Sequence, residues 1–204
     1  MRWKIKEDGN KEQIAQLKKD LVIPEIIAKL LVERGVINFD AAKKFFRPSL
    51  ESLHDPFLME DMQKAVDRIN EAIDKGQRIL IYGDYDVDGT TSVALMYSFL
   101  NRFTENIEFY QPDRYTEGYG VSMKSIEYAN SKKINLIIAL DCGIKAVDKV
   151  EKANEYGIDF IICDHHRPGQ ISPDALAILN PKKSTCSYPY DELCGCGIGL
   201  KLAQ

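Results

Sequence analysis

The fold of this chain is indicated most directly by the stretch Tyr82-Gly83-Asp84-Tyr85-Asp86-Val87-Asp88-Gly89-Thr90-Thr91-Ser92. It follows an apolar run that ends at Ile81 and precedes a second apolar run over residues 93–100. Apolar residues, then glycines, then Thr and Ser are typical of a strand followed by a capped helix. We therefore expect a strand before Tyr82 and a helix that begins near Val93.

Three carboxylates stand at alternating positions in this stretch: Asp84, Asp86 and Asp88. Crowding like charges raises their pKa values and costs free energy, and a multivalent cation removes that cost. The alternative is an acidic turn in which one Asp caps the following helix. Both interpretations stay open from this segment alone.

Composition restricts the class of protein. The chain has 204 residues, 45% of them hydrophobic, which is enough for a real core. No apolar stretch reaches membrane-spanning length, residues 1–4 are not followed by a signal-peptide core, and the five cysteines form no disulfide-like framework. We expect a cytoplasmic protein with no membrane partner. The net charge of −4 argues against non-specific wrapping of nucleic acid but allows a strand held locally at a metal site.

Two regions differ in their sequence pattern, and we place the boundary at residue 60. Residues 1–60 show short helical patterns, such as the spacing of Ile14, Leu17 and Leu21, and hold no cluster of chemical groups. We interpret this region as a helical cap or docking segment. From residue 61 onward, helix and strand patterns alternate to the end of the chain.

This alternation predicts an α/β fold with a Rossmann-like parallel sheet and helices on both faces, because the strands are continuous apolar runs. In such a sheet, ligands bind at the carboxyl ends of the strands. The expected strands are 78–82, 107–111, 135–140, 159–163 and 175–179, and the expected helices include a segment ending at Gly76, one running through Phe103, and the segments 122–131 and 146–156.

Acidic and imidazole residues follow three of these strands directly. They are Asp84, Asp86 and Asp88 after the first strand, Asp141 after the strand 135–140, and Asp164, His165 and His166 after the strand 159–163. Right-handed crossovers would bring these strand ends to one edge of the sheet. Oxygen-rich ligation with one or two imidazoles suits Mn²⁺ or Mg²⁺, and a pair of such ions about 3.5–4 Å apart is the usual device for phosphoester hydrolysis.

Each part of this set has a simpler interpretation. Asp141 could cap the next helix, and adjacent histidines on a loop are more often surface groups than ligands. The recurrence of three clusters at the same topological position favours a single site over these separate explanations.

The segment 111–120 follows another strand and is rich in glycine and aromatic residues. Arg114 could pair with a phosphate, and Tyr115 or Tyr119 could stack on a base. A solvated, glycine-rich loop is the alternative. The C-terminal thiols Cys186, Cys194 and Cys196 lack the usual zinc spacing, and we interpret them as buried or free thiols.

These motifs resemble the DHH phosphoesterase superfamily, and within it the RecJ family of single-strand-specific DNA exonucleases. The matching segments are 82–89, 113–120, 140–143 and the namesake Asp164-His165-His166, together with 180–183, 193–197 and the N-terminal segments 45–48 and 53–56. The resemblance covers essentially the whole chain. Related pyrophosphatases and oligonucleotide phosphatases usually have histidine at the position of Tyr82.

The resemblance implies a role for each residue of the site. Asp86, Asp88, Asp141 and His165 would be metal ligands, with Asp84 and Asp164 as further ligands or groups that orient the ligands, Asp164 beside His165. His166 would contact the scissile phosphate or its leaving oxygen, beside the catalytic Asp141 and His165. Arg114, Tyr115, Tyr119 and Gly120 would contact the substrate. The implied ion is Mn²⁺, with Mg²⁺ as a substitute. The implied reaction releases 5′-mononucleotides from single-stranded DNA in the 5′→3′ direction, in DNA repair and recombination.

The chain departs from the family pattern at its end. Family members continue past residue 204 into a strand with another ligand aspartate, then a DHHA1 domain and often an OB fold. The resemblance thus implies an incomplete two-metal site, a weak or inactive nuclease, and a possible separate chain that carries DHHA1. The alternatives are a phosphatase of short oligonucleotides, cyclic dinucleotides or pyrophosphate, and a non-catalytic fragment that binds DNA or a partner.

Overall fold

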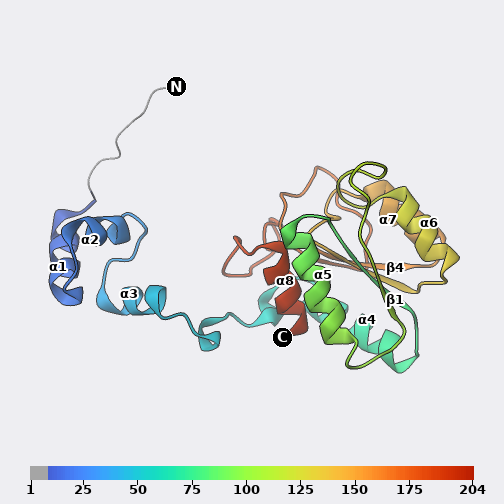
Figure 1. Ribbon diagram of the computed structural model, residues 1–204, viewed down its shortest axis with the longest axis horizontal. Coiled ribbons are helices and arrows are strands. Elements are labelled where there is room, and N and C mark those ends of the chain that lie inside the picture. Colours follow the sequence, from blue (N-terminus) through green and yellow to red (C-terminus); the bar gives the residue numbers. More distant parts are fainter. Residues whose placement is uncertain (1–8) are drawn as a thin grey trace, which may run out of the picture. The chain divides into compact units, whose positions relative to one another are not determined.

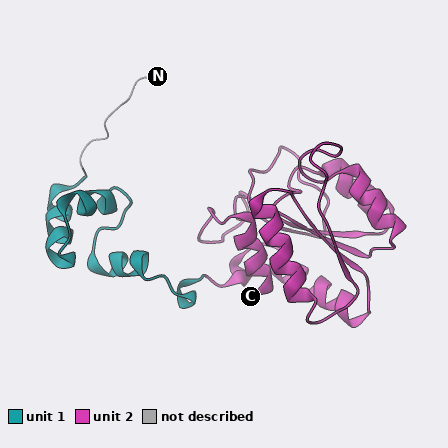
Figure 2. Ribbon diagram, in the orientation of Figure 1, with its two compact units in different colours: residues 1–53 teal, residues 54–204 magenta. Residues whose placement is uncertain are grey.

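A computed structural model describes residues 9–204, which divide into two compact units with a boundary between Leu53 and His54 (Figure 2). Residues 1–4, on which the expectation about a signal peptide was based, lie outside the described part. The domain boundary at residue 60 stays a prediction. Over residues 9–204, no helix is both long and apolar enough to cross a membrane.

The first unit is a small helical cluster. Its helices are α1 (Lys11–Leu21), α2 (Glu25–Val32) and α3 (Phe39–Phe46), followed by the 3₁₀ turn η1 (Leu50–Ser52) (Figure 1). Asn10 and Asn38 cap α1 and α3 through side-chain oxygens that accept backbone N–H groups. The core of this unit consists of Ile14, Leu17, Ala28, Leu31, Val36 and Ala42.

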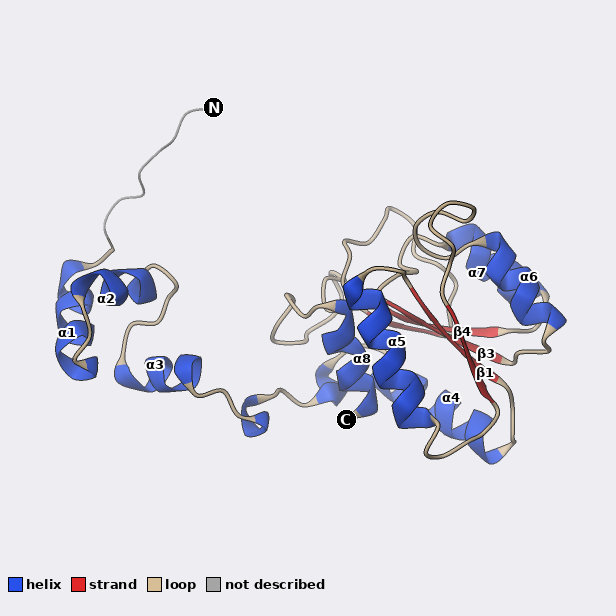
Figure 3. Cartoon of the chain, viewed as in Figure 1, coloured by secondary structure: helices blue, strands red, loops and turns tan. Residues whose placement is uncertain are grey.

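The second unit is built around a five-stranded parallel sheet in the order β2-β1-β3-β4-β5 (Figure 3). This architecture confirms the predicted α/β fold class. The strands are β1 (Ile79–Gly83), β2 (Ile107–Tyr110), β3 (Leu136–Leu140), β4 (Asp159–Cys163) and β5 (Ala177–Leu179). The other elements are η2 (Pro56–Leu58), α4 (Met62–Asp74), α5 (Val87–Leu100), α6 (Met123–Ser131), α7 (Val147–Glu155) and α8 (Gly195–Ala203).

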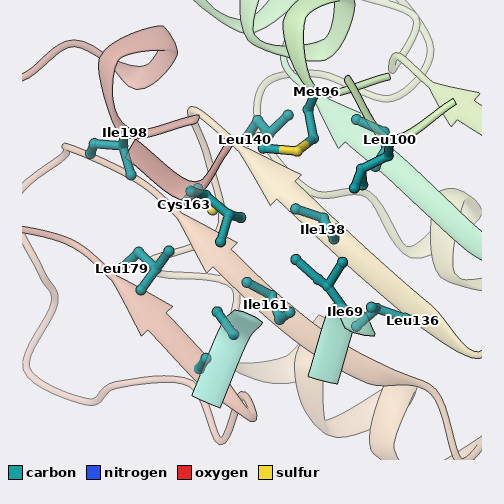
Figure 4. Close-up of a cluster of buried hydrophobic side chains, with 14 of the residues drawn as sticks. Ile69, Met96, Leu100, Leu136, Ile138, Leu140, Ile161, Cys163, Leu179 and Ile198 are labelled. Carbon is teal, nitrogen blue, oxygen red and sulfur yellow. The ribbon is translucent and has the colours of Figure 1, made fainter. Parts of the chain in front are cut away.

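Helices cover both faces of the sheet. Alternate residues of each strand point to opposite faces, and on each face they pack against helices. Ile138 and Leu140 of β3 pack with α4, α5 and α8 in one core cluster (Figure 4), whereas Ile137 and Ala139 pack with α6 and α7 in the other. Every residue of β1 and β3 is buried. The unbroken apolar runs in the sequence reflect this burial on both sides.

Helix α5 begins at Val87 rather than near Val93, so the predicted Thr/Ser cap is wrong. The cap is Asp86, whose side chain accepts the backbone N–H of Gly89 at 2.9 Å. A Cβ at Gly89 would lie 2.4 Å from the carbonyl oxygen of Asp84, so glycine lets the helix start immediately after the strand. The helix also ends earlier than predicted, at Leu100.

The strand order places a topological switch point beside β1. The chain passes from β1 to β2 on one side and later to β3 on the other. In open parallel sheets, ligands bind in the crevice at the carboxyl ends of the strands where the order reverses. The segments that follow β1, β3 and β4 therefore lie at the edge where a ligand is expected.

Candidate metal centre

The three clusters predicted from the sequence come from neighbouring strands. The order β1-β3-β4 brings the acidic turn after β1, Asp141 after β3, and the Asp164-His165-His166 segment after β4 to one edge of the sheet. Ligand atoms of Asp141, His165 and His166 lie within 4.8 Å of one another. Among the described residues, this is the group of side chains close enough to hold one metal ion.

Asp141 lies at the centre of this cluster and is 1% exposed. Its backbone is left-handed, with φ 62°, and its N–H donates to the carbonyl of Cys163 at 2.8 Å. His165 Nε2 lies 3.1 Å from Asp141 Oδ1, yet no well-oriented hydrogen bond reaches this buried oxygen. Burial, together with the nearby charges of Asp88 and Asp86, raises the pKa of Asp141 to about 7.

Asp141 does not cap the next helix, because the residue at the N-cap of α7 is Ala146. The capping alternative for Asp141 is therefore wrong. The strain of a left-handed aspartate and the cost of a buried carboxylate are both concentrated at one residue of the candidate site. A bound cation is the group that would offset the cost of the carboxylate.

Asp88 approaches the cluster from the first turn of α5, and its Oδ2 lies 3.8 Å from His165 Nε2. The first turn of α8 holds this carboxylate, because Gly195 donates its N–H to Oδ2 at 2.6 Å and Cys196 donates to Oδ1 at 2.8 Å. A Cβ at Gly195 would lie 2.4 Å from Asp141 Oδ1, so only glycine fits there. The segment 193–197 resembles a family block, but its sequence alone indicates no role at the site.

Asp164 is 1% exposed and orients His166, rather than His165 beside which the sequence placed it. Its Oδ2 accepts the N–H of Ile144 at 2.9 Å, and its Oδ1 accepts the backbone N–H of His166 at 3.0 Å and faces His166 Nδ1 at 2.7 Å. Burial opposes ionisation of Asp164, but these hydrogen bonds outweigh burial and lower its pKa. The hydrogen bond to Asp164 in turn raises the pKa of His166.

Asn180 was not predicted as part of the site. It is fully buried after β5, and its side-chain amide donates to the carbonyl oxygen of His166 at 2.9 Å. Its Oδ1 accepts the N–H of Lys182 at 2.8 Å, which fixes the orientation of the amide. Asn180 therefore anchors the backbone of the histidine pair from the neighbouring strand.

Asp84 and Asp86 lie at the same edge and hold backbone groups. Asp84 is buried, and its oxygens accept the N–H groups of Tyr85 at 2.7 Å and Gly120 at 3.2 Å. Burial raises the pKa of Asp84, and the nearby Asp86 adds to the effect. Asp86 is exposed and caps α5. The capping interpretation of the acidic turn thus holds for Asp86 and does not exclude a further role.

The segment 111–120 is held by hydrogen bonds, and residues 113–116 and Tyr119 are exposed, as the solvated alternative expects. Glu117 is almost fully buried and accepts hydrogen bonds from the hydroxyl groups of Tyr110 and Ser122. The carbonyl of Gly120 accepts the Tyr82 hydroxyl at 2.7 Å. The Tyr119 hydroxyl lies 3.3 Å from His166 Nε2, so this loop reaches the cluster.

The residues predicted to contact the substrate differ in whether they contact the carboxylates and histidines of the site. Tyr119 and Gly120 contact His166 and Asp84, as described above. The Arg114 guanidinium lies over the ring of Tyr85, 5.4 Å from its centroid, and Tyr85 packs against Tyr119. Tyr115 is 93% exposed and is not brought to the other site residues.

All five cysteines are free thiols, which agrees with their interpretation from the sequence. Cys194 Sγ accepts the N–H of Gly197 at 3.3 Å and so caps α8. Cys142 and Cys163 are buried, and burial raises the pKa of both thiols. Within residues 9–204, no cysteine belongs to the metal-binding group of side chains.

The donor set fits a divalent cation of the Mn²⁺ or Mg²⁺ type. A buried carboxylate oxygen without a hydrogen-bond partner faces an imidazole, and further carboxylates lie on the neighbouring turns. Carboxylate oxygens suit Mg²⁺ and Mn²⁺, and imidazole is a common ligand for transition metals. Thiolates, which a structural zinc site would favour, do not contribute.

Residues 78–204 match the family model described as "DHH family, N-terminal domain". The single-stranded-DNA-specific exonuclease RecJ of Bacillus subtilis is 41% identical over 204 residues, which is 100% of this chain and 26% of that protein. The protein of the same name from Escherichia coli is 33% identical over 181 residues, covering 88% of this chain and 31% of the relative. The chain thus spans roughly a quarter to a third of the length of these relatives.

Solved structures that are similar to the chain include two of RecJ. A crystal structure of exonuclease RecJ bound to manganese is 30% identical, has a TM-score of 0.65, and covers 71% of this chain and 37% of that one. RecJ from Thermus thermophilus in complex with Mn²⁺ gives a TM-score of 0.76 over 99% of this chain and 28% of that one. At 23% identity, the second similarity shows the fold alone.

Proposed function

This chain belongs to the DHH family, and from that premise we propose that its site hydrolyses phosphodiester bonds of single-stranded DNA with bound divalent ions. The observation that carries the proposal is the buried Asp141 Oδ1, which no hydrogen bond satisfies and which faces His165 at the switch point of the sheet. The names of the similar proteins support the substrate, and the manganese-bound structure of an exonuclease RecJ supports the ion.

We assign the ions to Asp86, Asp88, Asp141 and His165, with Asp84 as a further ligand or orienting group. Bound ions of this type lower the pKa of an attacking water and stabilise charge on the phosphoryl oxygens. The amides of Gly195 and Cys196 hold Asp88 toward His165 and so restrict the position of one ligand. Mn²⁺ is the preferred ion in this proposal, and Mg²⁺ is the substitute.

His166 is the chain's own proton donor in the proposed reaction. Asp164 and Asn180 fix its ring and backbone, and Nε2 points to the Tyr119 hydroxyl at the surface of the cluster. From this position Nε2 would donate a hydrogen bond, and then a proton, to the leaving oxygen of the scissile phosphate. Asp164 stabilises the protonated imidazole, because it stays ionised beside Nδ1.

The test is digestion of single-stranded DNA, labelled at the 5′ end or at the 3′ end, with enzyme in excess so that slow turnover is seen. We expect Mn²⁺-dependent release of mononucleotides from the 5′ end, and its loss in Asp141→Ala. The polarity rests on the resemblance, and the two labels test it directly. If Mn²⁺ binds but release matches that of Asp141→Ala, the hydrolytic proposal fails and a non-catalytic binding role is favoured.

A further inference from the structure

A cleft of about 320 Å³ opens beside the metal cluster on the side of α7. Its lining includes Tyr119 and Gly120, the loop after β3, and His166, which also belongs to the cluster. Lys145 and Lys149 also line the cleft. We call this space the lysine cleft. Its volume is at the lower end of the range of small-molecule sites, which run from about 300 Å³ upward.

The charge of the lysine cleft is opposite to that of the acidic cluster. Its one lining carboxylate, Asp164, is 1% exposed, and both of its oxygens already accept hydrogen bonds. Lys145 is exposed, and within residues 9–204 no carboxylate forms an ion pair with it. Its charge lies near enough to His166 to oppose protonation of that ring.

Lys149 is available to a ligand at little cost. Its ammonium lies 2.9 Å from Asp148, whose side chain is 64% exposed. Exposed ion pairs of this kind contribute little to stability, so an incoming anion can replace Asp148. The N-cap of α7, Ala146, also lines the cleft and has no side chain that caps the helix. The first N–H groups of α7 thus add to the positive potential made by the two lysines.

A phosphate group is the ligand that this combination suits. The lysine ammonium is a point charge that binds phosphate well, and Tyr119, which also lines the cleft, has an aromatic ring on which a base can stack. A nucleic-acid strand that places one phosphate at His166 would otherwise meet several carboxylates. The cleft is the neighbouring region where a second phosphate meets cations.

We propose that the lysine cleft binds a phosphate group of the substrate strand adjoining the one that is hydrolysed, through Lys145 and Lys149. This inference rests on the proposed function for the identity of the strand. The interaction fixes the register of the strand before any bond is broken. The two lysines are therefore binding residues and take no part in the chemical step.

The test compares Lys145→Gln, Lys149→Gln and the double variant with Lys152→Gln, which removes a charge from the same helix outside the cleft. Binding of a 3′-labelled oligothymidylate is followed by fluorescence anisotropy in EDTA at low ionic strength, so that no cleavage occurs. We expect about tenfold weaker binding by the double variant, and a salt dependence shallower by about 1 in the log–log slope. Lys152→Gln should bind within about twofold of wild type.

Three results would overturn the inference: no strand binding by the wild type, equal binding by the double variant, or an equal loss in Lys152→Gln. Thymidine 5′-monophosphate and inorganic phosphate serve as competitors at the same concentration. If inorganic phosphate displaces the strand as well as the nucleotide does, the cleft is a site for free phosphate instead. Thermal unfolding checks that each variant is folded. A wild type that binds the strand through these lysines but does not cleave it with Mn²⁺ refutes the proposed function and leaves the phosphate cleft standing.

Discussion

Replacing Gly195 with alanine should destabilise the sheet-containing unit and move Asp88. The new Cβ would lie 2.4 Å from Asp141 Oδ1 and 2.6 Å from Asp141 Cβ. Ordinary contact begins near 3.4 Å, so the first turn of α8 must retreat by about 1 Å. That shift lengthens the two hydrogen bonds that the backbone N–H groups of Gly195 and Cys196 donate to the Asp88 carboxylate. Their N–O distances, now 2.6 and 2.8 Å, would exceed hydrogen-bond distance.

The magnitude follows from these two bonds. Hydrogen bonds to a charged group contribute about 1.5–3 kcal/mol each, and Asp88 is open enough to solvent to justify the lower value. We therefore expect Gly195→Ala to lower the free energy of unfolding by about 3 kcal/mol. Urea denaturation followed through the NMR amide signals of β1 and β3 reports on this unit alone.

Gly197→Ala is the matched control in the same helix. A Cβ at Gly197 meets its nearest neighbour, a Leu193 methyl group, at 3.4 Å, which is ordinary contact. Alanine is a better helix former than glycine by up to about 1 kcal/mol, so this variant should be as stable as wild type or more so. The reasoning is refuted if Gly195→Ala unfolds within about 1 kcal/mol of wild type.

Three further variants test other parts of the site. In EDTA, Asp141→Asn should become more stable than wild type as pH rises. The pKa of the Asp141 carboxyl group is about 7 in the folded protein and 3.8 in the unfolded chain, so wild type loses up to about 4 kcal/mol of stability between these pH values. Parallel urea titrations that show no such divergence would contradict the burial of this charge. Asp164→Asn should lower the pKa of His166, as an NMR titration of the ring would show; an unchanged pKa would mean that the hydrogen bond to Asp164 does not control it. Tyr82→Phe, which removes only the hydroxyl that donates to Gly120, should lower the free energy of unfolding by about 1 kcal/mol in urea denaturation. An unchanged stability would mean that this hydrogen bond between β1 and the loop 111–120 does not stabilise the unit.

The fold was predictable because its signals are local. Each buried strand is a short apolar run, and the residue that follows it falls at one edge once the strands are parallel. Asp141 and the histidine pair lie at this edge, where the pattern predicts them. The start of α5 was not predictable in the same way, because Asp86 caps the helix only through the close approach of Gly89 to the backbone of Asp84.

The contacts that hold the site residues in place could not be predicted from a local sequence pattern, because they join residues that are distant in the sequence. The amides that hold Asp88 come from residues more than 100 positions away, on α8. Asn180 is likewise a single polar residue after a short strand, and its bond to His166 exists only in the folded sheet. By sequence Glu117 belongs to a glycine-rich segment, whereas in the structure its buried carboxylate accepts hydrogen bonds from Tyr110, Asp113 and Ser122. Single residues of this kind carry no periodicity from which their partners could be inferred.

Calorimetric titration of Mn²⁺ into the EDTA-treated and dialysed chain is the direct test of the metal centre, with Asp141→Asn and the exposed Asp67→Asn as paired variants. Both changes remove one carboxylate charge, but only Asp141 lies in the cluster. We expect saturable binding by wild type and Asp67→Asn, and an affinity at least about tenfold weaker in Asp141→Asn. Equal affinity in all three proteins, or no binding by wild type, would contradict the assignment of this strand edge as a metal centre.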